Sequence, residues 1–302
     1  MSTILEHIMR TSVNMEDTLG TDLATIDLDT ASYEELSELS GQSFGDTSDY
    51  TEDTFLKASI NLERKINDKS VPNPSYQMYA DGTPTFLTDD VKFVFLGKRY
   101  MFRVWDAEQK AHSIQTVMSE EYRNRDLMDT AGGFNAGNRG YIPKDVYETL
   151  SDAERKRHTD AKRTLVIYAL VRGKGKTLEG EPVDLDEWTP IRLFVSRSVA
   201  EYYEKVFKDF NRTKTPAFLK EVNLAELDVG KAGSFDIGVP KFAINEESSV
   251  DIASITSAMK DMVADIDSHN EWVQTEHMKA HREDSRQAQD VAFIEVLNEE
   301  DE

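Results

Sequence analysis

Basic and aromatic side chains alternate along residues 99–105, in the order Arg-Tyr-Met-Phe-Arg-Val-Trp. If this segment is a strand, successive side chains point to opposite faces of the sheet. Arg99, Arg103 and Trp105 then share one face, while the Tyr and Phe between them pack in the core. Guanidinium groups beside an indole can bind a phosphate backbone while a base stacks on the ring. The segment therefore predicts a surface for single-stranded nucleic acid, although an edge strand whose Trp covers a neighbouring helix would show the same pattern.

Two further basic segments follow along the chain. Residues 123–163 form a long, basic and glycine-rich connection, and a connection of this length within a compact domain is usually functional or disordered. The composition of residues 123–163 suits a flap that closes over a polyanion. The second basic segment, residues 172–176, is predicted to form a turn that directly follows an apolar run. The candidate DNA-binding residues are Lys98, Arg99, Arg103, Trp105, Arg123, Arg125, Phe134, Arg139, Tyr141, Arg155, Lys156, Arg157, Arg172, Lys174 and Lys176.

The charge of the chain is divided into three blocks. The 302 residues carry a formal net charge of −22. Residues 92–220 contain 24 Lys and Arg against 19 Asp and Glu, whereas residues 1–91 contain 5 against 18 and residues 221–302 contain 6 against 20. A basic middle between acidic arms is typical of a polyanion-binding core. Acidic arms that only keep a protein soluble would give the same composition.

The motifs of common enzyme classes are incomplete in this sequence. The absence of Cys excludes disulfides, thiolate catalysis and Cys-ligated metal sites. Gly175-Lys176-Thr177 resembles the end of a Walker loop, but Leu170 stands where that loop requires its first glycine. The glycines of residues 131–140 do not directly follow a predicted strand, as those of a dinucleotide-binding loop would. No pair of carboxylates stands out, so we expect neither an enzyme nor a cofactor.

Three histidines, His269, His277 and His281, can share one face of a C-terminal helix. Imidazoles on one face can bind a transition metal. The helix lacks the glutamate of a zincin motif, however, and exposed histidines are common on charged helices. We therefore expect a solvated face and no bound metal.

Neither a membrane span nor a secretory signal is visible in the sequence. No apolar run approaches the roughly 20 residues that a spanning helix needs. The first residues provide neither a basic nor an apolar signal region. Together with the lack of Cys, these observations predict a protein of the reducing cytoplasm that does not bind membranes.

The hydrophobic patterns predict an α+β domain with a mainly β core. Residues 91–96 and 99–105 read as two strands joined by a tight hairpin at Gly97-Lys98. Residues 164–171 form a continuous apolar run, which is typical of a buried central strand. Further strands are expected at 191–195, 218–227 and 234–244, with one helix from Ser198 to Phe210. Several short strands around one inserted helix predict an OB-like small barrel.

Four regions follow from these patterns and from the charge blocks. Residues 1–54 form an acidic, largely flexible arm, and residues 55–247 form the OB-like core with the basic insertion 123–163. Residues 248–289 form a C-terminal helix, and residues 290–302 form an acidic tail. The apolar stripe of that helix, which includes Ile255 and Met259, either packs on the barrel or forms an oligomer seam.

This layout resembles the single-stranded-DNA-binding proteins of tailed bacteriophages. The likeness covers residues 55–302: a barrel-like core rich in Arg, Lys and aromatics, a basic insertion, a strand–turn–strand containing Val239-Pro240-Lys241-Phe242, a helix and the acidic end. The resemblance implies an OB-fold that binds single strands without sequence preference, in phage replication, recombination and repair. The chain departs from the zinc-containing members of the family, because it has no Cys to build their metal site.

The resemblance also implies an acidic tail that recruits replication or recombination proteins in the cytoplasm of an infected bacterium. The candidate partner-binding residues are Phe293, Ile294, Glu299, Glu300, Asp301 and Glu302. A flexible anionic tail close to a basic groove would also compete with DNA for that groove. A homo-oligomer is compatible with these features.

Two other classes of function remain open from the sequence. The first is a virion or assembly protein whose C-terminal helix packs against copies of itself. The second is an acidic polyanion mimic that inhibits a nucleic-acid enzyme, which the overall charge favours. The basic middle block argues against mimicry, because a mimic presents acidic groups on its folded face.

Overall fold

The computed structural model describes residues 54–80, 83–106, 111–122 and 126–299, with side chains as far as Arg282. The predicted acidic arm lies outside the described residues except at Thr54, and so do Arg123 and Arg125. Glu300, Asp301 and Glu302 lie outside them as well. No helix in the described part is long and apolar enough to cross a membrane.

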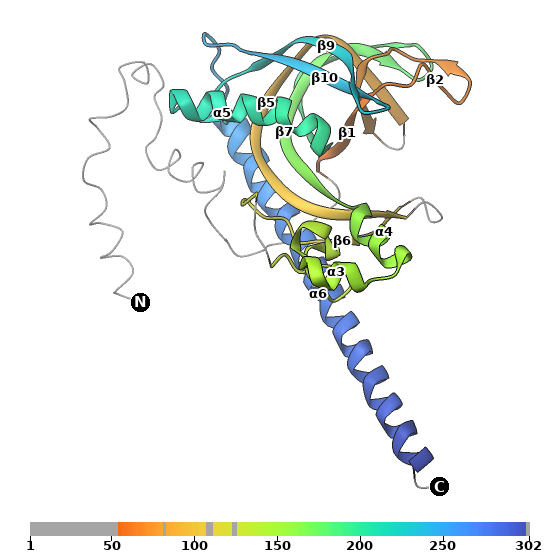
Figure 1. The fold of residues 1–302 in the computed structure, drawn as a ribbon. Helices are drawn as coiled ribbons and strands as arrows, with labels where there is room; N and C mark the ends of the chain where they lie inside the picture. The colour runs from red at the N-terminus through yellow and green to blue at the C-terminus, as the bar shows by residue number, and fades with distance from the viewer. Residues whose placement is uncertain (1–53, 81–82, 107–110, 123–125, 300–302) are drawn as a thin grey trace, which may run out of the picture.

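Five strands of the described chain close into a small barrel (Figure 1). They are β1 (Leu56–Asn61), β4 (Ser75–Ala80), β5 (Thr83–Asp106), β7 (Ala161–Thr177) and β8 (Pro182–Ser196). Each strand pairs antiparallel with the next, and β8 closes the barrel by pairing parallel with β1. The predicted fold class, an α+β protein with an OB-like small barrel, is confirmed. This barrel is similar to an OB-fold in size and in being closed, but its topology differs. Its neighbouring strands follow one another in sequence, whereas the strands of an OB-fold follow a Greek-key order.

The predicted buried strand, residues 164–171, lies within β7 and is covered on both faces. Ile167 and Ala169 point into the barrel, while Val166 and Tyr168 point outward into a second apolar core. Burial on both sides explains why this strand reads as a continuous apolar run rather than an alternating one.

The predicted hairpin at Gly97-Lys98 is wrong. The chain continues as one strand, β5, and pairs with β7 on both sides of this point, with a register shift between Phe95 and Gly97. Gly97 lacks the positive φ that a two-residue hairpin turn requires. The irregularity bends the long strand around the barrel instead of reversing it.

Helix α5 (Arg197–Thr213) covers one opening of the barrel, and a hairpin extends the sheet. Tyr203, Val206 and Phe210 of α5 belong to the interior core. Its N-cap is Ser196, two residues before the expected N-cap, Ser198. The short helix η4 (Ala217–Leu219) leads into the hairpin of β9 (Val222–Ala232) and β10 (Phe235–Ile244), and a second small hairpin contains β2 (Lys65–Ile66) and β3 (Lys69–Ser70).

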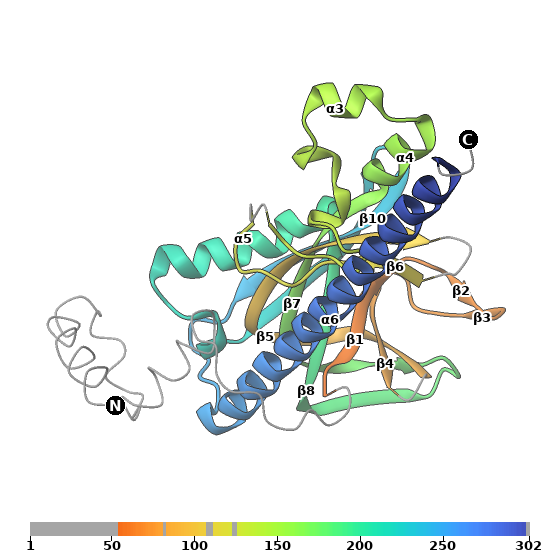
Figure 2. The ribbon, with the colours of Figure 1, turned by 90° about the horizontal axis from the view of Figure 1, so that it is seen from below.

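The long helix α6 (Ile252–Glu299) lies across the outer face of the barrel (Figure 2). Ile255, Met259 and Met262 of its apolar stripe are fully buried against this face. The stripe therefore covers the barrel of its own chain and is not an oligomer seam. The helix also continues to Glu299, so the predicted break before a flexible tail at residue 290 is not observed.

A buried ion pair fixes α6 to the barrel. Asp265 of α6 accepts a hydrogen bond from the Tyr168 hydroxyl at 2.5 Å and forms an ion pair with Arg192 of β8. Both charged side chains are largely buried. Removing one partner of such a pair leaves an uncompensated buried charge, so the pair fixes how the helix docks.

The segment between β5 and β7, which we call the insertion, is folded over its described residues, 111–122 and 126–160. It contains β6 (Ala111–Gln115), which pairs with the end of β5, and the helices η2 (Asn135–Gly137), η3 (Arg139–Tyr141), α3 (Lys144–Thr149) and α4 (Asp152–Asp160). Helix α4 begins with a capping box between Ser151 and Glu154. A small apolar cluster around Phe102 and Leu127 joins the insertion to the barrel.

Candidate nucleic-acid-binding groove

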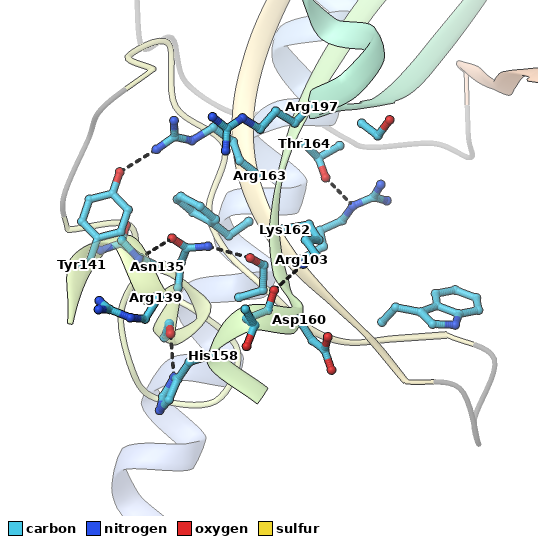
Figure 3. Close-up of a pocket in the computed structure, with 18 of the residues that line it drawn as sticks. Arg103, Asn135, Arg139, Tyr141, His158, Asp160, Lys162, Arg163, Thr164 and Arg197 are labelled. Carbon is cyan, nitrogen blue, oxygen red and sulfur yellow. Dashed lines mark hydrogen bonds between the residues drawn. The ribbon is translucent and has the colours of Figure 1, made fainter. Parts of the chain in front are cut away.

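A cavity of about 1760 Å³ lies between the insertion and the adjacent ends of β5, β7 and β8 (Figure 3). We call this cavity the groove. Its volume exceeds the roughly 300–1,000 Å³ of typical small-molecule pockets. The groove is therefore large enough for an extended ligand.

Five cationic side chains line the groove. Arg103 comes from β5, Lys162 and Arg163 from β7, Arg139 from η3 and Arg197 from α5. Within the described residues, none of the five forms an ion pair with a carboxylate. Asp126, Asp160 and Glu201 also line the cavity. Of these carboxylates, Asp160 binds Lys156 at 2.8 Å.

Arg163 and Arg139 are held by uncharged groups. Arg163 donates a hydrogen bond from Nη2 to the Tyr141 hydroxyl at 2.8 Å, and its guanidinium lies over the Tyr122 ring at 4.1 Å. Arg139 donates to the Ile142 carbonyl at 3.2 Å and lies over the Tyr147 ring at 3.9 Å. These contacts fix the guanidinium groups without neutralising their charge.

Arg103 is the most desolvated of the five groove cations. Its Nε donates to the Thr164 hydroxyl at 3.3 Å, and its guanidinium lies over the Phe194 ring at 4.3 Å. Burial and, to a smaller extent, the positive charge of the nearby Arg192 together lower the pKa of Arg103 to about 10. A half-buried cation without a counter-ion favours an anionic ligand that supplies one.

Three aromatic rings stand exposed around the same groove. The exposed fractions are 54% for Trp105, 51% for Phe134 and 42% for Tyr122. Trp105 also contacts the His112 ring edge-on at 5.1 Å between centroids. Exposed rings beside cations match the requirements of stacking on nucleic-acid bases while binding phosphates.

Asp129 organises the loop that carries Phe134. This carboxylate is buried, and it accepts hydrogen bonds from the backbone N–H groups of Ala131, Gly133 and Ala136 at 2.9–3.0 Å. This role of Asp129 was not predicted from the sequence. The glycines close to Asp129 were the only signal for a tight loop of this kind.

Gly137 and His158 fix the next turn of the insertion. Gly137 has a φ of +63°, and a Cβ at this position would lie 2.8 Å from the His158 ring. Nδ1 of His158 bonds to the Gly137 carbonyl at 2.6 Å, so we take Nδ1 as the donor. Only glycine therefore fits this position without strain.

The predicted histidine face of α6 anchors the insertion. Nε2 of His269 bonds to the Thr116 carbonyl at 2.9 Å, and Nδ1 of His277 bonds to the Asp129 carbonyl at 3.1 Å. Between them, Asn270 accepts a hydrogen bond from the Met118 backbone at 2.7 Å. The predicted solvated face is wrong for His269 and His277, because the insertion covers both.

The groove brings together five of the candidate residues from widely separated parts of the sequence. They are Arg103, Trp105, Phe134, Arg139 and Tyr141. The groove also contains residues that were not among the candidates: Tyr122, Lys162, Arg163, Phe194 and Arg197. Lys162 and Arg163 lie at the end of the basic segment 123–163, which was their only signal in the sequence, and nothing in the sequence pointed to Arg197.

Arg99 and Lys98 lie away from the groove. Arg99 is 8% exposed and forms an ion pair with Glu120 at 3.1 Å, because α6 and the start of the insertion cover this part of the face predicted to be open. Lys98 donates to the Tyr100 hydroxyl at 3.0 Å and lies over the Phe207 ring of α5. Neither residue contributes to the groove surface.

The remaining described candidates form two other groups. Arg155, Lys156 and Arg157 lie on α4 outside the groove lining, where Arg155 pairs with Asp152 and Lys156 with Asp160. The turn predicted at residues 172–176 is wrong, because β7 continues to Thr177. Arg172, Lys174 and Lys176, for which we keep the name basic turn, lie at the opposite end of β7 from the groove. Arg172 pairs with Glu221 at 2.7 Å and Lys174 with Asp184 at 3.3 Å. Phe293, Ile294 and Glu299 lie on the last turns of α6, beyond the described side chains.

Comparison with known proteins adds no assignment. No protein-family model, no curated protein and no solved structure matches the chain.

Proposed function

We propose that this protein binds single-stranded DNA in the groove, without sequence preference. The supporting observation is that cations without carboxylate partners and three exposed aromatic rings share one cavity. Lys and Arg that neutralise phosphates supply most of the affinity of such proteins, and rings stack on any base because every base has a π-face. Trp105, Tyr122 and Phe134 are the stacking candidates.

The two rival functions lose support. The apolar stripe that suggested self-assembly through α6 is buried against the barrel, including Ile255 and Met259. A polyanion mimic presents carboxylates on its folded face, whereas the groove presents five cations. Recruitment of replication or recombination proteins by residues 290–302, and a place in phage replication, rest on the acidity of this segment and on the family resemblance.

The proposal is tested by measuring affinity for oligo-dT by fluorescence anisotropy at several salt concentrations. The groove variant carries Arg139→Gln, Lys162→Gln and Arg197→Gln. We expect it to lower the slope of log affinity against log salt by about 2, at roughly 0.7 for each phosphate contact on a single strand.

The matched control carries Lys144→Gln, Lys156→Gln and Arg157→Gln. It also removes three positive charges, from α3 and α4 of the insertion, but leaves the groove lining intact. We expect its slope to stay close to that of the wild type. Equal losses of slope in both variants would mean that the net charge of the protein, and not the groove, determines binding. If the wild type binds no oligo-dT at low salt, the proposed function is refuted.

A further inference from the structure

Arg103 and Arg163 point to opposite faces of the sheet. In the pairing of β5 with β7, Arg103 lies opposite Lys162 and Phe102 lies opposite Arg163, with no register shift nearby. Paired residues of an antiparallel ladder share a face, and neighbours along a strand do not. The two arginines are therefore separated by the sheet itself.

The contacts of the two arginines agree with this separation. Arg103 lies over Phe194, which packs against the core beneath α6. Arg163 lies over Phe102 and Tyr122 at 5.0 and 4.1 Å, on the side of the insertion. Figure 3 shows Arg163 beside Arg197 on one side of the strands, and Arg103 with Thr164 on the other.

The groove reaches both faces because one edge of β7 is open at its start. The pairing of β7 with β8 begins at Thr164 opposite Ser196, so residues 161–163 have β5 on one side and no strand of the described chain on the other. At Ala161 this edge is covered by Asn138, whose Nδ2 donates to the Ala161 carbonyl at 2.6 Å, so the open part of the edge consists of Lys162 and Arg163. The cavity lining includes all of residues 161–163 together with both arginines. A flexible chain can therefore pass around this edge from one face to the other.

We propose that the bound strand passes around the edge of β7 at Lys162 and Arg163, placing one phosphate at Arg103 and another at Arg163. This inference rests on the proposed binding of single-stranded DNA in the groove. Duplex DNA is stiff over about 150 base pairs, so it cannot follow so sharp a path. The shape of the site, rather than recognition of bases, then selects single strands over duplexes.

The test measures salt slopes for Arg103→Gln, for Arg163→Gln and for the double variant on a single strand and a duplex of equal length. On oligo-dT of about 16 nucleotides, which is at the upper end of OB-fold site sizes, we expect each substitution to lower the slope by about 0.7 and the double substitution by about 1.4. On the duplex, we expect the double variant to lose no more than one contact, at most about 0.9. The variants Arg103→Lys and Arg163→Lys keep the charge and should retain the wild-type slope.

Three results would overturn the inference. The first is a double variant that loses no more slope on oligo-dT than either single variant does. The second is a duplex that is bound as tightly as oligo-dT and that loses both contacts. The third is a loss of slope in the Lys variants as large as in the Gln variants, because packing and not charge would then explain the effect. A wild-type protein that binds no oligo-dT refutes the proposed function itself and is distinct from all three.

Discussion

The two ends of β7 carry similar clusters of basic residues in different electrostatic settings. At the start of the strand, Arg163 is held by a tyrosine hydroxyl and two aromatic rings. At the end, Arg172 also lies over a ring, that of Trp188, but it pairs with Glu221 at 2.7 Å. Lys174 of the same turn pairs with Asp184. Both clusters were predicted as binding sites from the sequence. Arg172 and Lys174 are neutralised by carboxylates, whereas none of the five groove cations forms an ion pair within the described residues.

A candidate anion site is therefore identified by the lack of a carboxylate counter-ion, and not by the number of basic residues. The same contrast exists within one face of the barrel. Arg192 and Arg103 both contact the Phe194 ring, but Arg192 pairs with Asp265 and Arg103 has only a hydroxyl partner.

The largest effect is expected on folding stability, when Arg192 loses its carboxylate partner Asp265. Asp265→Ala should lower the free energy of unfolding by about 3–5 kcal/mol, because it leaves Arg192 buried without its partner. Denaturant unfolding monitored by circular dichroism measures this loss. The matched control is Asp184→Ala, which breaks an exposed pair with Lys174 and should cost about 0–1 kcal/mol.

The opposite effect on stability is expected at Arg103, which has no carboxylate partner in the described residues. Because burial lowers its pKa in the folded state, charged Arg103 costs stability at every pH below about 10, and the cost fades as the pH rises through that value. Arg103→Gln should therefore leave the free energy of unfolding at neutral pH unchanged or raise it. A loss as large as that of Asp265→Ala would mean that Arg103 has a stabilising partner.

The next effect concerns stacking. Trp105→Ala should weaken binding of oligo-dT by about 1–3 kcal/mol if a base stacks on the indole. It should leave the folded state nearly unchanged, because 54% of the side chain is exposed. The control is Phe235→Ala on the distant β9–β10 hairpin, which exposes a ring outside the groove. Equal losses of affinity in both variants would argue against a defined stacking site.

The smallest effect is expected at the basic turn. Arg172→Gln combined with Lys174→Gln should change the salt slope on oligo-dT by less than about 0.35, half of one phosphate contact. The reason is that Glu221 and Asp184 already neutralise these cations. A slope change of about 1.4, measured by the same anisotropy titration, would move the binding surface to this end of β7.

The local patterns of the sequence predicted much of the fold. The run at residues 164–171 identified the central strand because both of its faces are buried, and the stripe of α6 identified its packing face. The prediction of a hairpin at Gly97-Lys98 was wrong because a β-bulge and a turn favour the same residue types. Only the pairing with the partner strand, β7, distinguishes the two. Propensity alone does not contain that information.

The candidate site was only partly predictable for a similar reason. Alternation placed Arg99 and Arg103 on one face, but α6 and the insertion bury Arg99 beside Glu120 and leave Arg103 in the groove. Arg197 joins the groove only because β8 ends beside the start of β7. Such contacts arise from tertiary pairing, which spacing along the chain does not reveal.

Ultraviolet cross-linking of oligo-dT to the protein, followed by mass spectrometry of the cross-linked peptides, tests the central claim most directly. The account predicts that cross-links concentrate at Trp105, Tyr122 and Phe134, which surround the groove. They should disappear in the variant that carries Arg139→Gln, Lys162→Gln and Arg197→Gln. Cross-links centred on Trp188 beside the basic turn, or on Phe235, would contradict the assignment of the groove as the DNA-binding site.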